Sequence, residues 1–157
     1  MPEMMNKNLL FEINGNNGTD FIRIDEIRLN YPNAKTDRDK NSLNSKIDFK
    51  VGAFSGSLTT DLMTTDFELF KRELKILYEN LDRTAVFEGI ESQIIIHIKG
   101  DGIGHLIAKC FITDYVIDGN ELKCEIRFDQ TQIPKLIEQI EKITNEYPTT
   151  GDSKIPN

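Results

Sequence analysis

The sequence predicts an α+β fold, with two helices packed on one face of an antiparallel, bulged β-sheet. Three observations support this prediction. Segments with strand and helix periodicity follow one another in the order strands, helix, strands, helix. Short turns rather than helical crossovers join the strands, which is typical of antiparallel sheets. Each helical segment carries its apolar residues on one stripe, so each helix has one face to bury.

The N-terminal part of the chain contains two expected strands and a long polar loop. Residues 9–13 form the first strand, and the Asn- and Gly-rich residues 14–18 form a turn. The second strand covers residues 21–31. Its apolar alternation changes parity near Asp25-Glu26, which predicts a β-bulge. Residues 32–44 contain almost no apolar side chains, so we expect a solvated hairpin connection there.

A long strand and the clearest helix follow this loop. In residues 47–58 the apolar alternation changes parity after Gly52, which predicts one strand with a second bulge. Residues 64–81 form the helix, with Thr65 and Glu68 spaced as a capping box. The apolar stripe of this helix consists of Phe67, Phe70, Leu74, Leu77, Tyr78 and Leu81.

Four strands and a second helix complete the fold. The strands are expected at residues 84–88, 93–99, 103–116 and 121–129. The dipeptides Asp101-Gly102 and Asp118-Gly119 predict two-residue hairpin turns. The helix covers residues 131–146, and either Asp129 or Thr131 caps its N-terminus. Its apolar stripe consists of Ile133, Leu136, Ile137, Ile140 and Ile143.

Length and composition predict one domain. The chain has 157 residues, of which 38% are hydrophobic and 29% charged, as in ordinary globular proteins. We expect a single α+β domain over residues 9–147. Residues 1–8 are expected to be a flexible N-terminus and residues 148–157 a disordered polar tail.

The charge balance narrows the classes of partner. Lys and Arg number 19 against 26 Asp and Glu, which gives a net charge of −7. Such a chain is a poor nucleic-acid binder, because phosphate contacts need cations. The sequence contains no apolar run of membrane-spanning length and no apolar signal core at its N-terminus. We therefore expect a cytoplasmic protein without a nucleic-acid or membrane partner.

The two cysteines are expected to be reduced thiols. A two-residue turn at Asp118-Gly119 places Cys110 and Cys124 on opposite faces of the sheet. A three-residue loop places them on one face but about 13 Å apart along the strand. Neither register allows a disulfide.

The two histidines are not expected to form a metal site. With a turn at Asp101-Gly102, His97 and His105 project from opposite faces of the sheet. No third ligand with zinc-like spacing accompanies them. No serine lies in a nucleophile-elbow motif, and the glycines of residues 100–104 precede a strand rather than a helix. We therefore expect no catalytic residue, no metal and no cofactor.

An acidic cluster around the last hairpin is the best candidate for a binding surface. Asp114, Asp118, Glu121 and Glu125 lie close together in the sequence there. A solvated sheet face of mixed charge explains the cluster simply, since Lys123 alternates with these acids. A surface that binds a protein partner is the sharper alternative.

Several motifs, taken together, resemble the WapI-type immunity proteins of bacteria. They are the helix at residues 65–78, Ala85-Val86-Phe87-Glu88, Gln93, Gly100-Asp101-Gly102-Ile103-Gly104-His105, and Asp129-Gln130-Thr131-Gln132-Ile133-Pro134. The resemblance covers roughly residues 45–145, and the last two motifs are its most specific parts. None of them is a catalytic signature.

The resemblance implies a non-enzymatic protein that binds the toxic C-terminal domain of a cognate toxin, typically a nuclease that attacks tRNA. An acidic inhibitor suits a basic nuclease, because opposite charges speed association. Two other classes remain open. One is a small ligand-binding domain or enzyme with a pocket between sheet and helices. The other is a homomeric module, such as a homodimer, that uses an exposed strand edge.

Overall fold

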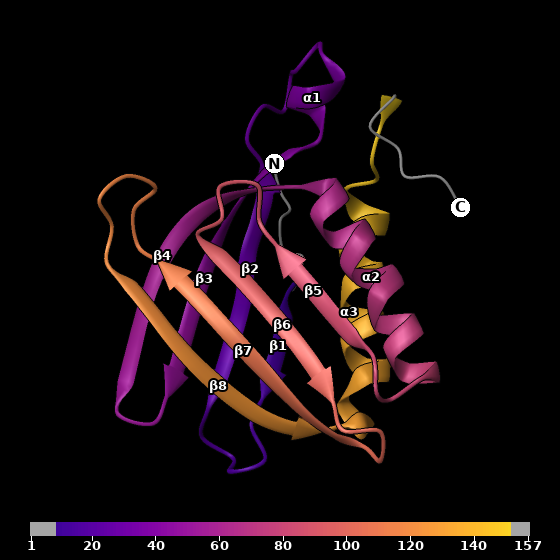
Figure 1. Cartoon of the computed structure of the whole chain (residues 1–157). Coiled ribbons are helices and arrows are strands. Elements are labelled where there is room, and N and C mark those ends of the chain that lie inside the picture. Colours follow the sequence, from indigo (N-terminus) through magenta and orange to yellow (C-terminus); the bar gives the residue numbers. More distant parts are fainter. Residues whose placement is uncertain (1–8, 152–157) are drawn as a thin grey trace.

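The computed structural model describes residues 9–151 and confirms the α+β class (Figure 1). The strands are β1 (Phe11–Asn14), β2 (Phe21–Leu29), β3 (Ser42–Val51), β4 (Phe54–Met63), β5 (Thr84–Glu88), β6 (Ile94–Gly100), β7 (His105–Thr113) and β8 (Glu121–Asp129). The helices are α1 (Asp37–Lys40), α2 (Thr64–Glu79), the 3-10 turn η1 (Gln130–Gln132) and α3 (Ile133–Glu146).

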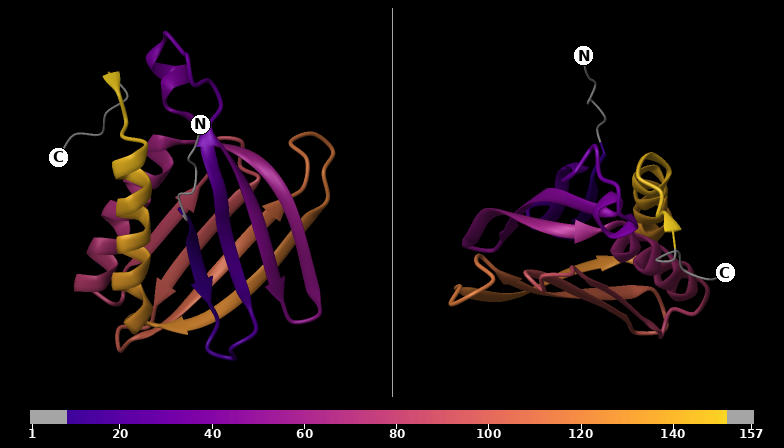
Figure 2. Two further views of the ribbon diagram at one scale, coloured as in Figure 1. Left: turned by 180° about the vertical axis from the view of Figure 1, so that it is seen from behind. Right: turned by 90° about the horizontal axis from the view of Figure 1, so that it is seen from above.

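The strands form two antiparallel sheets where the sequence pattern predicts one. The N-terminal sheet has the order β1-β2-β3-β4 and the C-terminal sheet the order β5-β6-β7-β8. The two sheets stack on each other, and their inner faces share one hydrophobic core (Figure 2). Periodicity shows which face a strand buries but not which strands share a ladder, so the division into sheets was not visible in the sequence.

The two long helices lie together on one side of the sheet stack (Figure 2). They contact each other, and α2 also contacts β5 while α3 contacts β1. α2 follows the N-terminal sheet in the chain but packs on β5, the first strand of the C-terminal sheet. α3 follows the C-terminal sheet but packs on β1, the first strand of the N-terminal sheet. The helices close the open side between two sheets rather than covering the face of one. No helix within residues 9–151 has the length and apolar content that a membrane span needs.

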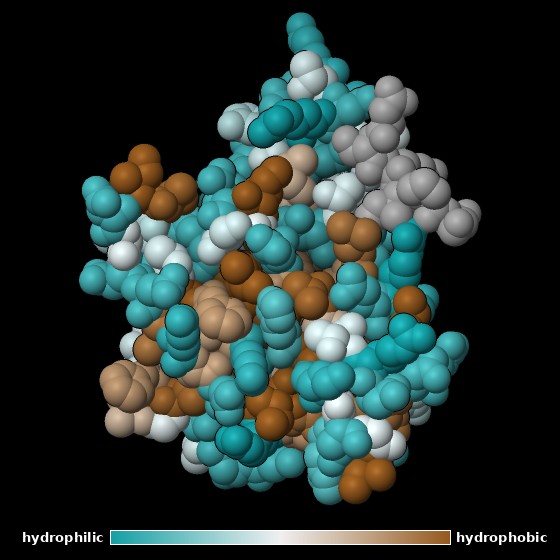
Figure 3. Space-filling model, viewed as in Figure 1, coloured by the Kyte–Doolittle hydropathy of each residue, from teal (hydrophilic) through white to brown (hydrophobic). Residues whose placement is uncertain are grey.

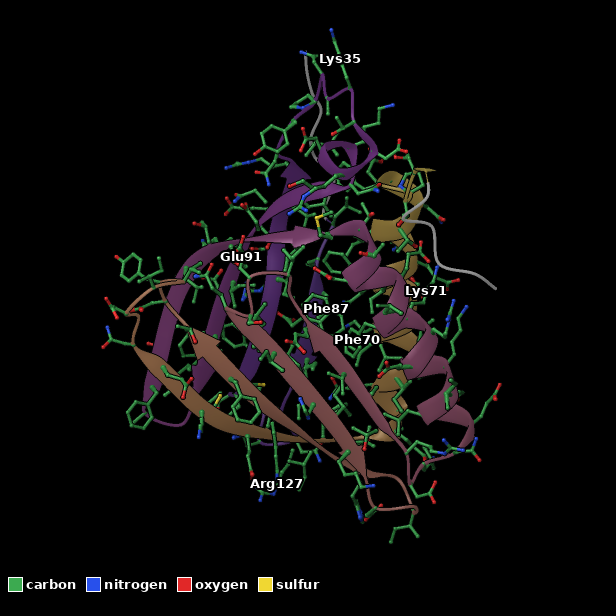
Figure 4. The ribbon with its side chains drawn as sticks, turned by 45° about the horizontal axis from the view of Figure 1, so that its top comes forward. Lys35, Phe70, Lys71, Phe87, Glu91 and Arg127 are labelled. Atoms are coloured by element: carbon green, nitrogen blue, oxygen red, sulfur yellow. The ribbon has the colours of Figure 1, made fainter. Side chains whose placement is uncertain are left out.

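Four aromatic rings join the sheets to α2 in the core. The Phe70 ring lies 5.3 Å from that of Phe11 and 5.4 Å from that of Phe87, measured between centroids. Phe67 lies 5.4 Å from Phe87. Figure 4 shows Phe70 and Phe87 directed toward each other from α2 and β5. Tilted and edge-on rings at these distances add to the stabilisation that their burial supplies.

One predicted bulge is confirmed and the other is wrong. The pairing of β2 with β3 shifts register between Asp25 and Arg28, and Glu26 has a positive φ of 49°. The second change of parity reflects a hairpin, because Val51 pairs with Phe54 across a two-residue turn. Gly52 has a φ of 61° in that turn, a conformation that glycine adopts without steric cost.

Buried Asn41 orders a segment that was expected to be a disordered tail. Its side chain donates to the Thr150 carbonyl at 3.0 Å and accepts from the Thr150 N–H at 2.8 Å. The Thr149 hydroxyl lies 2.8 Å from that of Thr64. Residues 148–151 therefore differ from the expectation, because bonds to a distant side chain leave no local sequence pattern. The terminal expectations for residues 1–8 and 152–157 lie outside the described residues.

The N-terminus of α2 uses a different acid from the one expected. The Asp66 carboxylate accepts a hydrogen bond from the Met63 N–H at 2.8 Å. The predicted Thr65–Glu68 capping box is wrong, and Glu68 instead forms an ion pair with Lys71. At the second helix the Asp129 carboxylate accepts from the Thr131 N–H at 2.9 Å, so the acid caps that turn.

Asp66 is expected to make stability depend on pH. Burial raises the pKa of its carboxyl to about 6, although bonds from the Met63 and Ile90 N–H groups oppose this effect. A raised pKa means that the folded state holds the proton more tightly. The protonated Asp66 carboxyl therefore contributes most to the free energy of unfolding below its usual pKa near 3.8. This contribution is lost as pH rises through about 6.

The variant Asp66→Asn tests this expectation, because its amide cannot ionise but its oxygen still accepts from Met63. Relative to the native chain, it should gain about 1.4 kcal/mol of stability as pH rises from about 5 to about 7.5, because only the last pH unit below the raised pKa lies in this range. Urea unfolding of both chains at the two pH values gives this difference. Parallel pH dependence of both chains would show that Asp66 is ionised throughout the range.

Candidate functional site

The loop between β7 and β8 presents three consecutive apolar side chains to solvent. Thr113 and Glu121 form the last strand pair, so residues 114–120 make up the loop. Tyr115, Val116 and Ile117 are 68%, 58% and 80% exposed. Figure 3 shows this hydrophobic tip at the upper left. We call these three residues the apolar tip.

The sequence pattern does not reveal the apolar tip. It predicts a strand through residue 116 and a two-residue turn at Asp118-Gly119. Both expectations are wrong, because β7 ends at Thr113 and a seven-residue loop follows. Apolar residues that continue a strand pattern look the same in the sequence whether they pair or protrude.

Local contacts close the loop at its base. The Asp114 carboxylate accepts from the Asn120 N–H at 2.7 Å and from the Asn120 side-chain amide at 3.0 Å, and these bonds lower the pKa of Asp114. A β-carbon on Gly119 would lie 2.3 Å from the Tyr115 carbonyl oxygen, so only glycine fits there. A loop that is already shaped loses less conformational entropy when it binds a partner.

The structure gathers three of the four predicted acids around the apolar tip. Asp118 lies in the loop and Glu121 at the start of β8, and both are exposed. Within residues 9–151 neither side chain forms a hydrogen bond or ion pair. Asp114 has a structural role instead, because its carboxylate holds Asn120. An apolar tip with an acidic rim is therefore available to a partner.

Glu125 belongs to the outer face of the C-terminal sheet rather than to the loop. It pairs with Lys109 in the ladder and lies 3.3 Å from Arg127 in an ion pair. Four residues of strand place it about 13 Å from Glu121. Figure 4 shows Arg127 pointing away from the sheet into solvent.

The rest of this outer face mixes cations with partly exposed apolar residues (Figure 3). The Phe111 ring lies 5.9 Å from the His97 ring between centroids, and the Lys123 ammonium lies 5.9 Å from the Phe111 centroid. Cations and acids alternate along β8, which is typical of a solvated strand face.

The model of the immunity protein WapI-like family matches residues 12–148, which is most of the chain. The chain belongs to the WapI-like immunity protein family. No curated protein matches this WapI-like chain. The solved structure of the plant transcriptional regulator PBF-2 is similar at a TM-score of 0.49 and 11% identity, covering 96% of this chain and 92% of that one.

The histidines of this WapI-like protein lie on the same face of the sheet, contrary to expectation. Gly100 pairs with Leu106, so the β6–β7 turn is longer than two residues and the register differs. His105 Nδ1 lies 2.8 Å from the Asp101 carboxylate. That carboxylate also accepts from the Ile103 and His105 N–H groups, which lowers the pKa of Asp101 to about 2. Asp101 thus shapes the glycine-rich hairpin between β6 and β7.

The cysteines are direct cross-strand partners, which corrects the predicted register. The seven-residue loop pairs Cys110 with Cys124 on the inner face of the sheet. Both are free thiols, as expected, but not because the strands hold them apart. A hydrogen bond to Cys124, together with burial, raises the pKa of Cys110, so its thiol is protonated and unreactive.

An open hollow lies beside α2 and β5. It is close to the position between sheet and helices where a pocket would favour the alternative of an enzyme or ligand-binding domain. Its volume is about 380 Å³, and Glu73, Ile76, Arg83 and Thr84 line it. The Glu73 carboxylate accepts from the Val86 N–H at 2.8 Å and so joins helix to strand. Within residues 9–151 no group of three or more His, Cys, Asp or Glu side chains could hold a metal ion.

Proposed function

We propose that this WapI-like protein neutralises the toxic C-terminal domain of a cognate bacterial toxin by stoichiometric binding, without turnover. Membership of an immunity protein family supports a toxin as the partner. We further propose that the toxin is a nuclease, such as one that cleaves tRNA, because a basic nuclease suits an inhibitor of net charge −7.

The apolar tip is the observation that carries the proposed binding surface. Tyr115 and its two aliphatic neighbours are exposed on a loop whose base is closed by Asp114 and Asn120. Aromatic anchors that enter a partner's pocket supply most of the binding energy in protein interfaces. Asp118 and Glu121 flank the anchor and suit a basic rim around such a pocket. Insertion of the tip would block the toxin sterically.

Charge complementarity makes association sensitive to salt. We expect the association rate constant for the toxin domain to fall at least about 10-fold between about 50 mM and about 500 mM NaCl, because added ions screen the attraction. Stopped-flow mixing with a catalytically inactive toxin domain measures this rate. An association rate that is indifferent to ionic strength would contradict electrostatic steering, although not binding itself.

Co-expression in a bacterium tests the function directly. The toxin candidate to co-express is the C-terminal domain of any large secreted protein that is encoded beside this gene. We expect cells to die when they express that domain alone and to survive when they also express this protein. Purification of a one-to-one complex with the inactive toxin domain gives the stoichiometry. Death in both cultures, with no complex, would reject the proposal for that pair.

A further inference from the structure

The free edge of β4 differs from every other sheet edge in residues 9–151. The four edge strands there are β1, β4, β5 and β8. An exposed edge carries unpaired backbone N–H and C=O groups that another strand can pair with. Folded proteins usually cover such an edge or place charges on it.

Side chains from η1 and α3 cover the edge of β1. The Glu12 N–H donates to the Gln139 side-chain oxygen at 3.0 Å, and the Asn14 N–H donates to the Gln132 side-chain oxygen at 3.2 Å. Gln132 also donates back to the Asn14 carbonyl at 2.6 Å. Both outward N–H groups thus have partners, and a further strand cannot pair there.

The edges of β5 and β8 are also occupied. The outward N–H of Val86 in β5 donates to the Glu73 carboxylate of α2 at 2.8 Å. The Arg127 carbonyl in β8 accepts from the Asn16 N–H at 2.8 Å, so the β1–β2 turn lies against that edge. Contacts from other elements therefore cover the edge of β1 and part of the edges of β5 and β8, and the rest of β8 carries alternating charged residues.

The first seven residues of β4 have neither cover nor charge at their free edge. These residues, Phe54 to Thr60, include no charged residue and no proline. Phe54 is 64% exposed, and Leu58 is only partly buried. Within residues 9–151 no side chain bonds to the outward backbone groups of these residues. An uncharged, open strand of this length is a template for another strand.

The register shows which backbone groups face outward. Across a two-residue turn the first pair, here Val51 and Phe54, bonds inward, and inward and outward residues then alternate. The Ser42 carbonyl accepts from Asn30 of the neighbouring loop, so the partner of Ser42 in β4, Met63, faces outward. Odd-numbered residues of β4 therefore direct their N–H and C=O groups to the free edge.

The β4 edge and the apolar tip lie on the same side of the molecule. Figure 1 shows both at the left, and the two views of Figure 2 place them on one common side, away from α2 and α3. One partner can therefore contact both surfaces. We propose that an extended, uncharged segment of the toxin domain adds to the N-terminal sheet as a fifth strand beside β4, which rests on the proposed toxin-binding function.

The substitution Ser57→Pro tests this strand addition. It removes an outward N–H and places a ring at the edge, but it breaks no bond to β3. Ser57→Ala is the matched control, because it removes the hydroxyl and keeps the N–H. We expect Ser57→Pro to weaken binding of the inactive toxin domain at least about 10-fold and Ser57→Ala to change it less than about 2-fold. Equal affinities of both variants and the native protein would overturn the inference.

Amide hydrogen exchange of the native protein gives a second test that needs no variant. The N–H groups of Ser55, Ser57 and Thr59 should exchange rapidly in the free protein and at least about 100-fold more slowly in the complex. Unchanged exchange in a complex that does form would overturn strand addition and leave the proposed function intact. Protection in the free protein that grows with its concentration would instead assign the edge to a second copy of this chain.

Discussion

Replacing all three residues of the apolar tip by alanine is expected to weaken toxin binding at least about 100-fold. This loss corresponds to about 3 kcal/mol, which is typical when a central aromatic anchor and its aliphatic neighbours are truncated. Tyr115, Val116 and Ile117 are exposed in the free protein. Their removal should therefore leave the fold stable, because it creates no cavity. Titration calorimetry with the inactive toxin domain measures the affinity.

Ile103 provides the matched control for this prediction. It is 78% exposed, close to the 80% of Ile117, and it lies beyond the opposite end of β7. Nine residues of strand separate the two loops by about 30 Å. Ile117→Ala should weaken binding, whereas Ile103→Ala should not. Native affinity of the triple variant would move the interface away from the β7–β8 loop.

The variant Gly100→Ala is expected to lose about 3 kcal/mol of stability. A β-carbon at this position would lie 1.9 Å from the backbone carbonyl oxygen of Leu81. That carbonyl accepts a hydrogen bond from the Gly102 N–H at 3.0 Å, so it cannot withdraw without breaking the bond. Overpacking against backbone costs at least as much as overpacking against a flexible side chain. For a chain of this size the unfolding midpoint should fall by about 6–12 °C.

Thermal unfolding followed by circular dichroism measures this shift. Ile103→Ala lies in the same hairpin and removes only exposed atoms, so its midpoint should change by less than about 2 °C. A native midpoint for Gly100→Ala would show that the loop at Leu81 yields easily. The expected loss also gives this glycine of the β6–β7 hairpin a steric role.

Local periodicity accounts for the elements that the sequence predicted well. The bounds of β5 and β8 agree with the expectation, and the buried faces of α2 and α3 are the predicted stripes up to Leu77 and Ile143. Burying one face of a strand or helix imposes a period on neighbouring residues, so this information is local. Tyr78 departs from its stripe and is 49% exposed, although it lies within α2.

Only part of the candidate site could be predicted from the sequence, because sequence patterns carry local information. The acids could be predicted, because the charge of each residue is known from its type alone. The apolar tip could not, because Tyr115 and Val116 continue the apolar pattern of β7 and differ from it only in lacking a strand partner. The carboxylate of Asp114 and the amide of Asn120 decide where the strand ends, and that contact joins residues six positions apart.

The sequence by itself determined the two long helices with their buried faces, strands such as β5 and β8, the net charge of −7 and the match to an immunity protein family. Only the tertiary structure decided that the strands form two sheets, that Cys110 faces Cys124, and that the edge of β4 stays open. Each of these outcomes depends on which distant backbone groups pair with one another. Pairing between distant strands is set by loop length and by competition among edges, and neither leaves a period in the sequence.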